Sequence, residues 1–264
     1  LFKIIKNMAP ELLLDDWQED ILKTEGHILL CTGRQVGKTT IFAIKACKEM
    51  LKKANTRIVM ASLTEDQAKN IIVMILNYLE VHAKKMIAKG KNKPTQSKIT
   101  LTNGSNVVVR PVGQTGDAIR SFTGDILYLD EASRMSEITF TAGKPILLTT
   151  AGRIWMSSTP KGKQGYFYEC FVNKNERFKV FHISSEEVMN KRPISESWSE
   201  TRRAEALKFL EEEKKDMSLL QYGQEYLGLF LEDLQAYFDD ALIEKCCIMR
   251  RPEPPKPHSN LYMG

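Results

Sequence analysis

Residues 31–40 place a glycine-containing turn, a lysine and two threonines directly after the apolar run 27–30. This sequence, Cys-Thr-Gly-Arg-Gln-Val-Gly-Lys-Thr-Thr, is typical of a phosphate-binding loop between a strand and a helix. Backbone N–H groups of such a loop, together with the helix N-terminus, bind phosphate oxygens. We therefore expect the chain to bind and hydrolyse a nucleoside triphosphate. The predicted nucleotide-binding residues of the loop are Gly33, Arg34, Gln35, Val36, Gly37, Lys38, Thr39 and Thr40.

The side chains of this loop have distinct predicted roles. Lys38 would contact the β- and γ-phosphates, and the Thr39 hydroxyl would bind Mg²⁺. Thr32 stands where the general pattern G-x-x-x-x-G-K-[ST] has its first glycine, so the loop departs from that pattern. Arg34 adds a fixed positive charge beside the phosphates. It would either stabilise the transition state or have a structural role.

Two adjacent acids, Asp130 and Glu131, end the apolar run 126–129. Hydrolysis of a nucleotide requires one carboxylate to hold Mg²⁺ through its water shell and another to orient the attacking water. Asp130 suits the first role and Glu131 the second. Together with the loop, this pair predicts a complete hydrolytic site.

Three further segments give weaker signals. Arg120, shortly before the two acids, could neutralise charge during phosphoryl transfer or could be merely structural. Ser157, Ser158 and Thr159 end another apolar run, where hydroxyls could sense the γ-phosphate and couple its loss to movement, or simply form a turn. Gln18 could bind adenine through its amide, or could be solvated on a helix surface.

Strand and helix patterns alternate along most of the chain. This alternation predicts an α/β fold with a mostly parallel sheet flanked by helices, and with ligands at the carboxyl ends of the strands. Asn103-Gly104 indicates a β-hairpin. The predicted helices cover 15–22, 38–53 and 65–89, and the predicted strands cover 27–32, 57–61, 125–129, 152–157 and 177–182, with the hairpin at 97–110.

The pattern becomes helical after the last predicted strand, with many Glu and Lys residues over 197–227. A stiff, proline-rich stretch follows at 252–257. We therefore predict a P-loop ATPase core over residues 1–190, a helical lid or linker subdomain over 191–250, and a proline-rich linker with the start of another domain over 251–264.

The composition is that of a globular protein, with 42% hydrophobic and 27% charged residues among 264. No apolar stretch approaches the roughly 18–20 residues that a membrane-spanning helix needs, so no membrane partner is expected. The five cysteines are scattered without metal-ligand spacing, which favours free, idle thiols.

The net charge of +5 is unevenly distributed. No acidic residue lies between Glu80 and Asp117, whereas that interval holds many basic ones. A solvated surface is one interpretation, and contact with a nucleic-acid backbone is the other. In the second interpretation the candidate DNA contacts are Lys84, Lys85 and Lys89.

Taken in order, these motifs resemble the ATPase domain of the large terminase subunit of tailed bacteriophages, the motor that packages viral DNA. The resemblance covers most of the chain. In the family, glycine often follows the arginine that Arg120 matches, and Ser121 stands there instead. The resemblance rests on Gln18 and on residues 33–39, 101–105, 119–120, 129–132, 158–162 and 224–228.

The resemblance implies a P-loop NTPase fold of the RecA/ASCE-like class that uses ATP and Mg²⁺. It implies that Arg34 is the loop arginine, that Arg120 is an arginine finger offered to a neighbouring subunit, and that Ser158 and Thr159 couple hydrolysis to DNA movement. Hydrolysis itself would be carried by Lys38, Thr39, Asp130 and Glu131.

The implied partners are double-stranded DNA, the portal protein of an empty capsid and the small terminase subunit. The family implies a homo-oligomeric ring, commonly a pentamer, with a monomer as the alternative in isolation. The implied location is the cytoplasm of the infected bacterium, at the procapsid. Residues 260–264 resemble the start of a nuclease domain and stop before its metal-binding aspartate, so no nuclease activity is expected from this chain.

Two rival functions share parts of this pattern. A helicase or another DNA translocase would have the same loop and acids, although only the helical region remains where a second RecA-like domain would have to lie. A nucleotide-gated assembly protein would bind ATP to order a ring, with turnover incidental.

Overall fold

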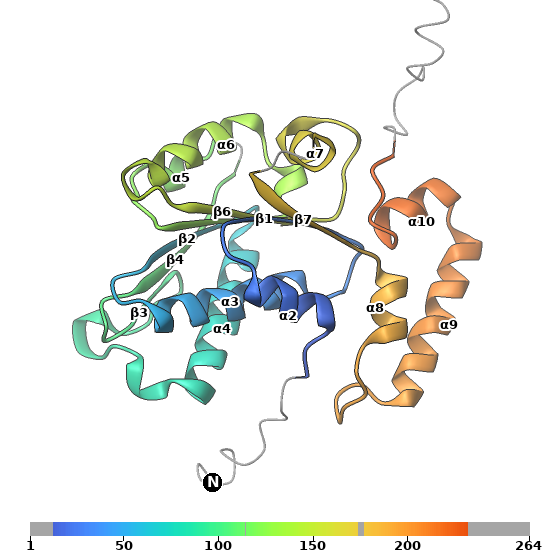
Figure 1. Cartoon of the computed structure of the whole chain (residues 1–264), viewed down its shortest axis with the longest axis horizontal. Helices are drawn as coiled ribbons and strands as arrows, with labels where there is room; N and C mark the ends of the chain where they lie inside the picture. The colour runs from blue at the N-terminus through green and yellow to red at the C-terminus, as the bar shows by residue number, and fades with distance from the viewer. Residues whose placement is uncertain (1–12, 114, 174–176, 232–264) are drawn as a thin grey trace, which may run out of the picture. The chain divides into compact units, whose positions relative to one another are not determined.

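The core of the fold is a seven-stranded sheet in the order β3-β4-β2-β5-β6-β1-β7 (Figure 1). The structure, a computed structural model, describes residues 13–113, 115–173 and 177–231. Neighbouring strands are parallel except β3 and β4, which pair antiparallel. The strands are β1 (His27–Thr32), β2 (Arg57–Ser62), β3 (Lys98–Thr100), β4 (Asn106–Pro111), β5 (Ile126–Asp130), β6 (Arg153–Ser158) and β7 (Phe178–Ile183).

Helices cover both faces of the sheet (Figure 1). One face carries α2 (Asp16–Lys23), α3 (Lys38–Lys52) and α4 (Glu65–His82), and the other carries α5 (Asp117–Arg120), α6 (Glu137–Gly143) and α7 (Gly165–Val172). Beyond β7 lie α8 (Ser185–Lys191), α9 (Glu200–Asp216) and α10 (Leu219–Glu225). Short 3₁₀ helices lie at Lys84–Met86, Gly90–Asn92, Ala132–Arg134 and Lys144–Thr150.

The predicted strands, the helices predicted at 15–22 and 38–53 and the hairpin around Asn103-Gly104 are confirmed, with ends that differ by a residue or two. Helices α5 to α8 are not among the predicted elements. The predicted helix 65–89 is too long, because α4 ends at His82. Ala83 leaves the helical conformation, and the chain turns so that Ile87 forms a bridge to Leu101 beside the hairpin. Burial of Ile87, which is 8% exposed, stabilises this turn.

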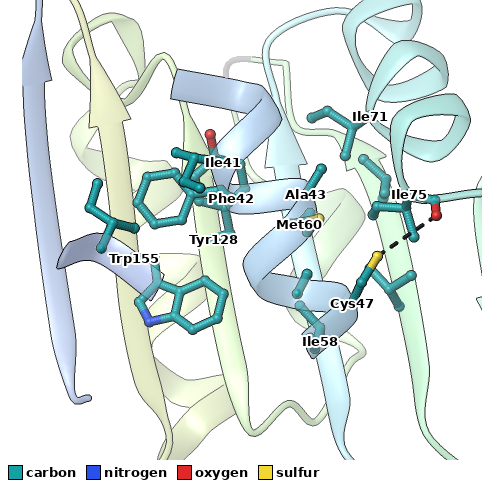
Figure 2. Packing of buried hydrophobic residues seen from close by; sticks show 14 of the residues in the cluster. Ile41, Phe42, Ala43, Cys47, Ile58, Met60, Ile71, Ile75, Tyr128 and Trp155 are labelled. Carbon is teal, nitrogen blue, oxygen red and sulfur yellow. Dashed lines mark hydrogen bonds between the residues drawn. The ribbon is translucent and has the colours of Figure 1, made fainter. Parts of the chain in front are cut away.

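Two hydrophobic clusters lie on opposite faces of the sheet because side chains alternate along each strand. On the face towards α3, Phe42 packs against Tyr128 of β5 and Trp155 of β6 (Figure 2). Leu127 and Leu129 belong to the opposite cluster. The alternation therefore decides which polar residues at the strand ends face α3 and which face the other side.

In the described part of the chain, no helix is long and apolar enough to cross a membrane. Among the same residues, no group of three or more His, Cys, Asp or Glu side chains could hold a metal ion. Cys31, Cys47 and Cys170 are free and buried. Burial raises the pKa of the Cys47 thiol to about 12, so that thiol is protonated and unreactive near neutral pH. Cys246 and Cys247 lie outside the described residues.

The predicted domain boundaries remain predictions. The described residues, which end at 231, form one unit by their internal contacts. Residues 232–264 lie outside the described residues. The predicted start of a nuclease domain also falls there.

Candidate active site

The loop between β1 and α3 has the backbone shape that phosphate binding requires. Gly37 precedes α3 with φ of 95°, and Gln35 has φ of 61°, both in the left-handed region. A turn of this kind directs successive backbone N–H groups towards one point at the helix N-terminus. Lys38 and Thr39 then open α3, so their side chains start at the same end of the helix.

The beginning of the loop is hydrogen-bonded to the end of β7 and to the helices that follow it. The Gly33 N–H donates to the Ile183 carbonyl at 3.0 Å, and the Arg34 N–H donates to the Glu225 carbonyl at 2.8 Å. The Ser185 hydroxyl donates to the Arg34 carbonyl at 2.7 Å. The Arg34 guanidinium also forms an ion pair with the Glu225 carboxylate. The phosphate-binding loop is thus attached to α8 and α10.

This attachment explains why Gly33 stands one position late in the general pattern. A Cβ at position 33 would lie 2.2 Å from the Tyr226 carbonyl oxygen and 2.4 Å from the Ser185 hydroxyl. No side chain fits at such distances without movement of the backbone. Glycine is therefore required here by the close approach of α8 and α10.

We predict that Gly33→Ala lowers the free energy of unfolding by about 1–3 kcal/mol, because the added methyl group overpacks this contact. Urea denaturation measures the change. The matched control is Gly223→Ala on α10, where the nearest atoms are the ends of leucine side chains at 3.3 and 3.5 Å. The control should not lower the free energy of unfolding, because alanine has a higher helix propensity than glycine. Equal losses in the two variants would contradict the account of Gly33.

The two acids that end β5 meet the first two residues of α3. The Thr39 hydroxyl donates to Asp130 Oδ2 at 3.1 Å. Lys38 Nζ lies 2.9 Å from Glu131 Oε1, and these two side chains are 13% and 19% exposed. Glu131 has φ of 58°, a left-handed conformation that ends the strand abruptly. The structure thus brings together the four side chains to which the sequence assigned hydrolysis.

Strand β6 lies between β1 and β5 and adds hydroxyls to this group. Ser157 is in register with Asp130 and donates to Asp130 Oδ1 at 3.0 Å. Ser158, on the opposite face, donates to Glu131 Oε2 at 3.2 Å. Ser133, which sequence reasoning missed, lies 2.8 Å from the Ser158 hydroxyl and donates to the Thr159 carbonyl at 2.7 Å. Each acid is therefore held by its own serine.

The donor set suits Mg²⁺ better than a soft metal. Asp130 and Thr39 offer hard oxygen atoms beside the loop, and no thiol or imidazole joins them among the described contacts. Burial raises the pKa of Asp130, the neighbouring Glu131 adds to this, and Lys38 and the hydrogen bond from Tyr128 oppose it. A divalent cation would stabilise the ionised form of this carboxylate.

A pocket of about 300 Å³ lies beside these residues. Lys38 and Glu131 line it with Arg34, and Arg134 lines it as a cation that the sequence prediction did not include. The pocket is therefore rich in positive charge, as a site for a triphosphate would be. Its lining is completed by Gln35, Leu63, Gln67 and Thr159.

A second pocket, of about 230 Å³, lies at Gly37 and Thr40 and contains Gln18. Gln18 is only 8% exposed, so it is not a solvated surface residue. Its side-chain oxygen accepts the Asp15 N–H at 3.0 Å, which fixes the amide and leaves its NH₂ group as donor. Trp198 and other residues of 192–198 also line this pocket. This pocket has the lining expected for a planar base.

Arg192 connects the two sides of this pocket, and sequence reasoning missed it. Its guanidinium donates to Asp15 Oδ2 at 2.9 Å and to the Val36 carbonyl at 3.0 Å, and it lies over the Trp198 ring at 5.5 Å. It thereby joins α2, the phosphate-binding loop and the helical region. No local sequence motif predicts these contacts of Arg192, because its partners Asp15 and Val36 are far away in the sequence.

Two groups of predicted residues lie outside both pockets. Arg120 forms an ion pair with Asp117 at 2.8 Å and is 54% exposed, so it is accessible to another molecule. Lys84, Lys85 and Lys89 are exposed beyond the end of α4. Lys84 pairs with Glu80 at 2.8 Å. These residues remain candidates for contacts with partners.

The order of the motifs and the geometry of the loop and acids agree with one family. Residues 29–245 match the family model described as "Terminase large subunit, T4likevirus-type, N-terminal". The chain belongs to this family. It corresponds to the N-terminal part of a large terminase subunit, and the rival interpretation as a helicase is not favoured. A comparison with curated proteins finds no significant match.

Solved structures of large terminases share the fold. The ATPase domain from Thermus phage P74-26 has a TM-score of 0.61 and 21% identity, over 81% of this chain and 92% of that one. The large terminase of another thermophilic bacteriophage, in complex with ADP, has a TM-score of 0.64 and 15% identity, over 82% of this chain and 53% of that one. The HK97 large terminase has a TM-score of 0.59 and 14% identity, over 82% and 50%.

The chain therefore spans about half the length of the last two of these proteins. The predicted fold class, a P-loop NTPase of the ASCE type, is confirmed. Structures of the second of these terminases contain ADP or ATP-γ-S.

Proposed function

We propose that this chain hydrolyses ATP to drive double-stranded DNA into a capsid. The proposal rests on two contacts at one end of the sheet. Lys38 lies against Glu131, and the Thr39 hydroxyl donates to Asp130. Phosphate-binding and hydrolytic groups that lie far apart in the sequence thereby form one site. The family relationship supplies the link from hydrolysis to DNA movement.

The Lys38–Glu131 ion pair indicates how these side chains act. A triphosphate in the loop would compete with Glu131 for Lys38, because both are anions. Release of the carboxylate leaves it free to orient and polarise the attacking water. Ser158 keeps a hydrogen bond to Glu131 Oε2 and would restrict where the carboxylate moves. Thr39 and Asp130 would hold Mg²⁺, which neutralises charge on the β- and γ-phosphates when bound.

Nucleotide binding would use both pockets. The phosphates would lie at Arg34 and Lys38, and the base would lie in the pocket that Gln18 and Trp198 line. Gln18 would donate its NH₂ group to a ring nitrogen of adenine. The hydroxyl groups of Ser157, Ser158 and Thr159 would respond to the loss of the γ-phosphate. They would transmit that structural change to the rest of the motor.

The family suggests a ring of copies on the portal protein, commonly a pentamer, with the small terminase subunit as a further partner. The cytoplasm of an infected bacterium, at the procapsid, is then the place of action. In such a ring Arg120 would be offered to the site of a neighbouring subunit. Its exposure and its position outside both pockets are compatible with that role.

The test is steady-state ATP turnover of the purified chain with and without linear double-stranded DNA, alongside its oligomeric state in light scattering. A motor ATPase should turn over faster with DNA or in assembled rings. The alternative, a nucleotide-gated assembly protein, predicts rings that form with ATP in Glu131→Ala protein and turnover that DNA does not change. That second result would overturn the proposal.

We predict that reversing the charges of Lys84, Lys85 and Lys89 weakens DNA binding. If all three contact phosphates, the slope of log affinity against log salt concentration should fall by about 3, or about 1 for each lysine. Fluorescence anisotropy of labelled duplex DNA at several salt concentrations measures both quantities. The control reverses Lys23, Lys208 and Lys215, which are exposed on α2 and α9. An unchanged slope in the first variant would remove these lysines from the DNA contact.

A further inference from the structure

Tyr128 is a polar residue in the middle of β5, whose other residues before the terminal Asp130 are apolar. It is 0% exposed and is among the largest fully buried side chains. It precedes Asp130 on β5 by two positions, so the two side chains lie on the same face of the sheet. A buried phenol requires a hydrogen-bond partner, whereas phenylalanine would fill nearly the same space without one.

The phenol finds its partners in the active site. Its hydroxyl donates to Asp130 Oδ1 at 2.7 Å and lies 2.8 Å from the Ser157 hydroxyl. Ser157 in turn donates to the same Asp130 oxygen at 3.0 Å. These three groups form a closed triangle. Asp130 is 4% exposed and Ser157 is 0% exposed, so water does not replace these contacts.

The two carboxylate oxygens of Asp130 have different hydrogen-bond donors. Oδ1 accepts from Tyr128 and Ser157, whereas Oδ2 is the nearer oxygen to the Thr39 hydroxyl, at 3.1 Å. A carboxylate fixed through one oxygen cannot rotate without breaking two hydrogen bonds to a charged group. Its other oxygen is thereby kept towards Thr39 and the phosphate-binding loop.

The ring of Tyr128 is itself held by α3. It stacks on Phe42, with ring centroids 4.6 Å apart and an angle of 28° between the planes (Figure 2). Phe42 lies on the same helix as Thr39. The position of the phenol is therefore set by the helix that carries the hydroxyl on the other side of Asp130.

We propose that Tyr128, supported by Ser157, is a positioning residue that orients Asp130 for the divalent cation accompanying the nucleotide. This inference rests on the proposed function, because it assumes that a metal–nucleotide complex binds beside Thr39. In this inference Ser157 helps to orient Asp130, the carboxylate beside the cation. Ser158 instead forms a hydrogen bond with Glu131.

The test is the affinity for Mn²⁺, a spectroscopic substitute for Mg²⁺ with the same preference for oxygen ligands. Electron paramagnetic resonance measures free Mn²⁺ during titration of the ADP-saturated protein. Tyr128→Phe should weaken Mn²⁺ binding about tenfold, the size expected for the loss of one hydrogen bond to a charged acceptor. Affinity for ADP in EDTA should stay unchanged, since no metal is then involved. Ser157→Ala should shift Mn²⁺ affinity in the same direction.

Tyr222→Phe is the matched control. Tyr222 is 2% exposed and its hydroxyl donates to Glu186 Oε1 at 2.8 Å, so the control also removes a phenol–carboxylate bond from a buried tyrosine. It should lower the melting temperature without changing Mn²⁺ affinity. Circular dichroism checks the folding of each variant, and if Tyr128→Phe does not fold, Ser157→Ala decides the question.

The possible failures are distinguishable. Wild-type Mn²⁺ affinity in both Tyr128→Phe and Ser157→Ala, with only lower melting temperatures, would show that the triangle is structural and would overturn the inference alone. Wild-type protein that binds neither ADP nor Mn²⁺–ADP would overturn the proposed function, and the inference with it.

Discussion

Glu131→Gln is expected to reduce ATP turnover by about 10²- to 10⁴-fold, the usual contribution of a positioned general base. The amide keeps the shape of the side chain and an oxygen for the Ser158 hydroxyl, which now lies 3.2 Å from Glu131 Oε2. It cannot accept a proton from water at neutral pH. Release of inorganic phosphate at saturating ATP measures the loss.

Affinity for ATP should not fall in the same variant. Lys38 lies 2.9 Å from Glu131 Oε1, so removal of the carboxylate charge frees Lys38 for phosphate. Titration with a fluorescent ATP analogue measures this affinity. Glu65→Gln, which neutralises an exposed carboxylate at the start of α4, is the control and should leave turnover unchanged. Wild-type turnover in Glu131→Gln protein would remove this residue from catalysis.

Arg34→Ala is expected to lower turnover by about 10³-fold or more, if the guanidinium stabilises the charge of the transition state as catalytic arginines do. Arg34 lines the pocket that also contains Lys38 and Glu131. Its ion pair with Glu225 is half exposed on the arginine side, at 56%, and contributes little to stability. The variant should therefore fold, and circular dichroism can verify this.

Glu225→Gln separates the two possible roles of Arg34. It removes the ionic partner on α10 but keeps the guanidinium beside the phosphates. If Arg34 acts on the phosphates, Glu225→Gln protein should retain turnover while Arg34→Ala protein loses it. Equal losses in the two variants would instead show that Arg34 acts through its attachment to α10, the structural role that the sequence left open.

The sequence predicts that the four side chains of the proposed hydrolytic site lie together because each belongs to a local motif at the end of a strand. Lys38 and Thr39 follow the loop after β1, and Asp130 and Glu131 end β5. In a parallel sheet the carboxyl ends of strands lie at one edge, so motifs found separately meet there. The end of α4 at His82 was not predictable in this way, because the pairing of Ile87 with Leu101 decides it.

The residues that sequence reasoning missed depend on contacts between distant segments. Arg192 reaches Asp15, which lies 177 positions away in the sequence, and Glu225 reaches Arg34 from α10. No periodicity reveals such pairs. Tyr128 was more accessible to prediction, since strand alternation alone places it beneath Asp130. The Asp15–Gln18 contact also has a local signature, the spacing of a capping box.

The most direct test of the central claim is a crystal structure of this chain with Mg²⁺ and ATP-γ-S. We predict phosphates bound by the loop 33–39 with Lys38 released from Glu131, the metal ion at Thr39 on the Asp130 side, and the base beside Gln18. A nucleotide bound elsewhere, or a Lys38–Glu131 ion pair left intact beside the bound triphosphate, would contradict the account.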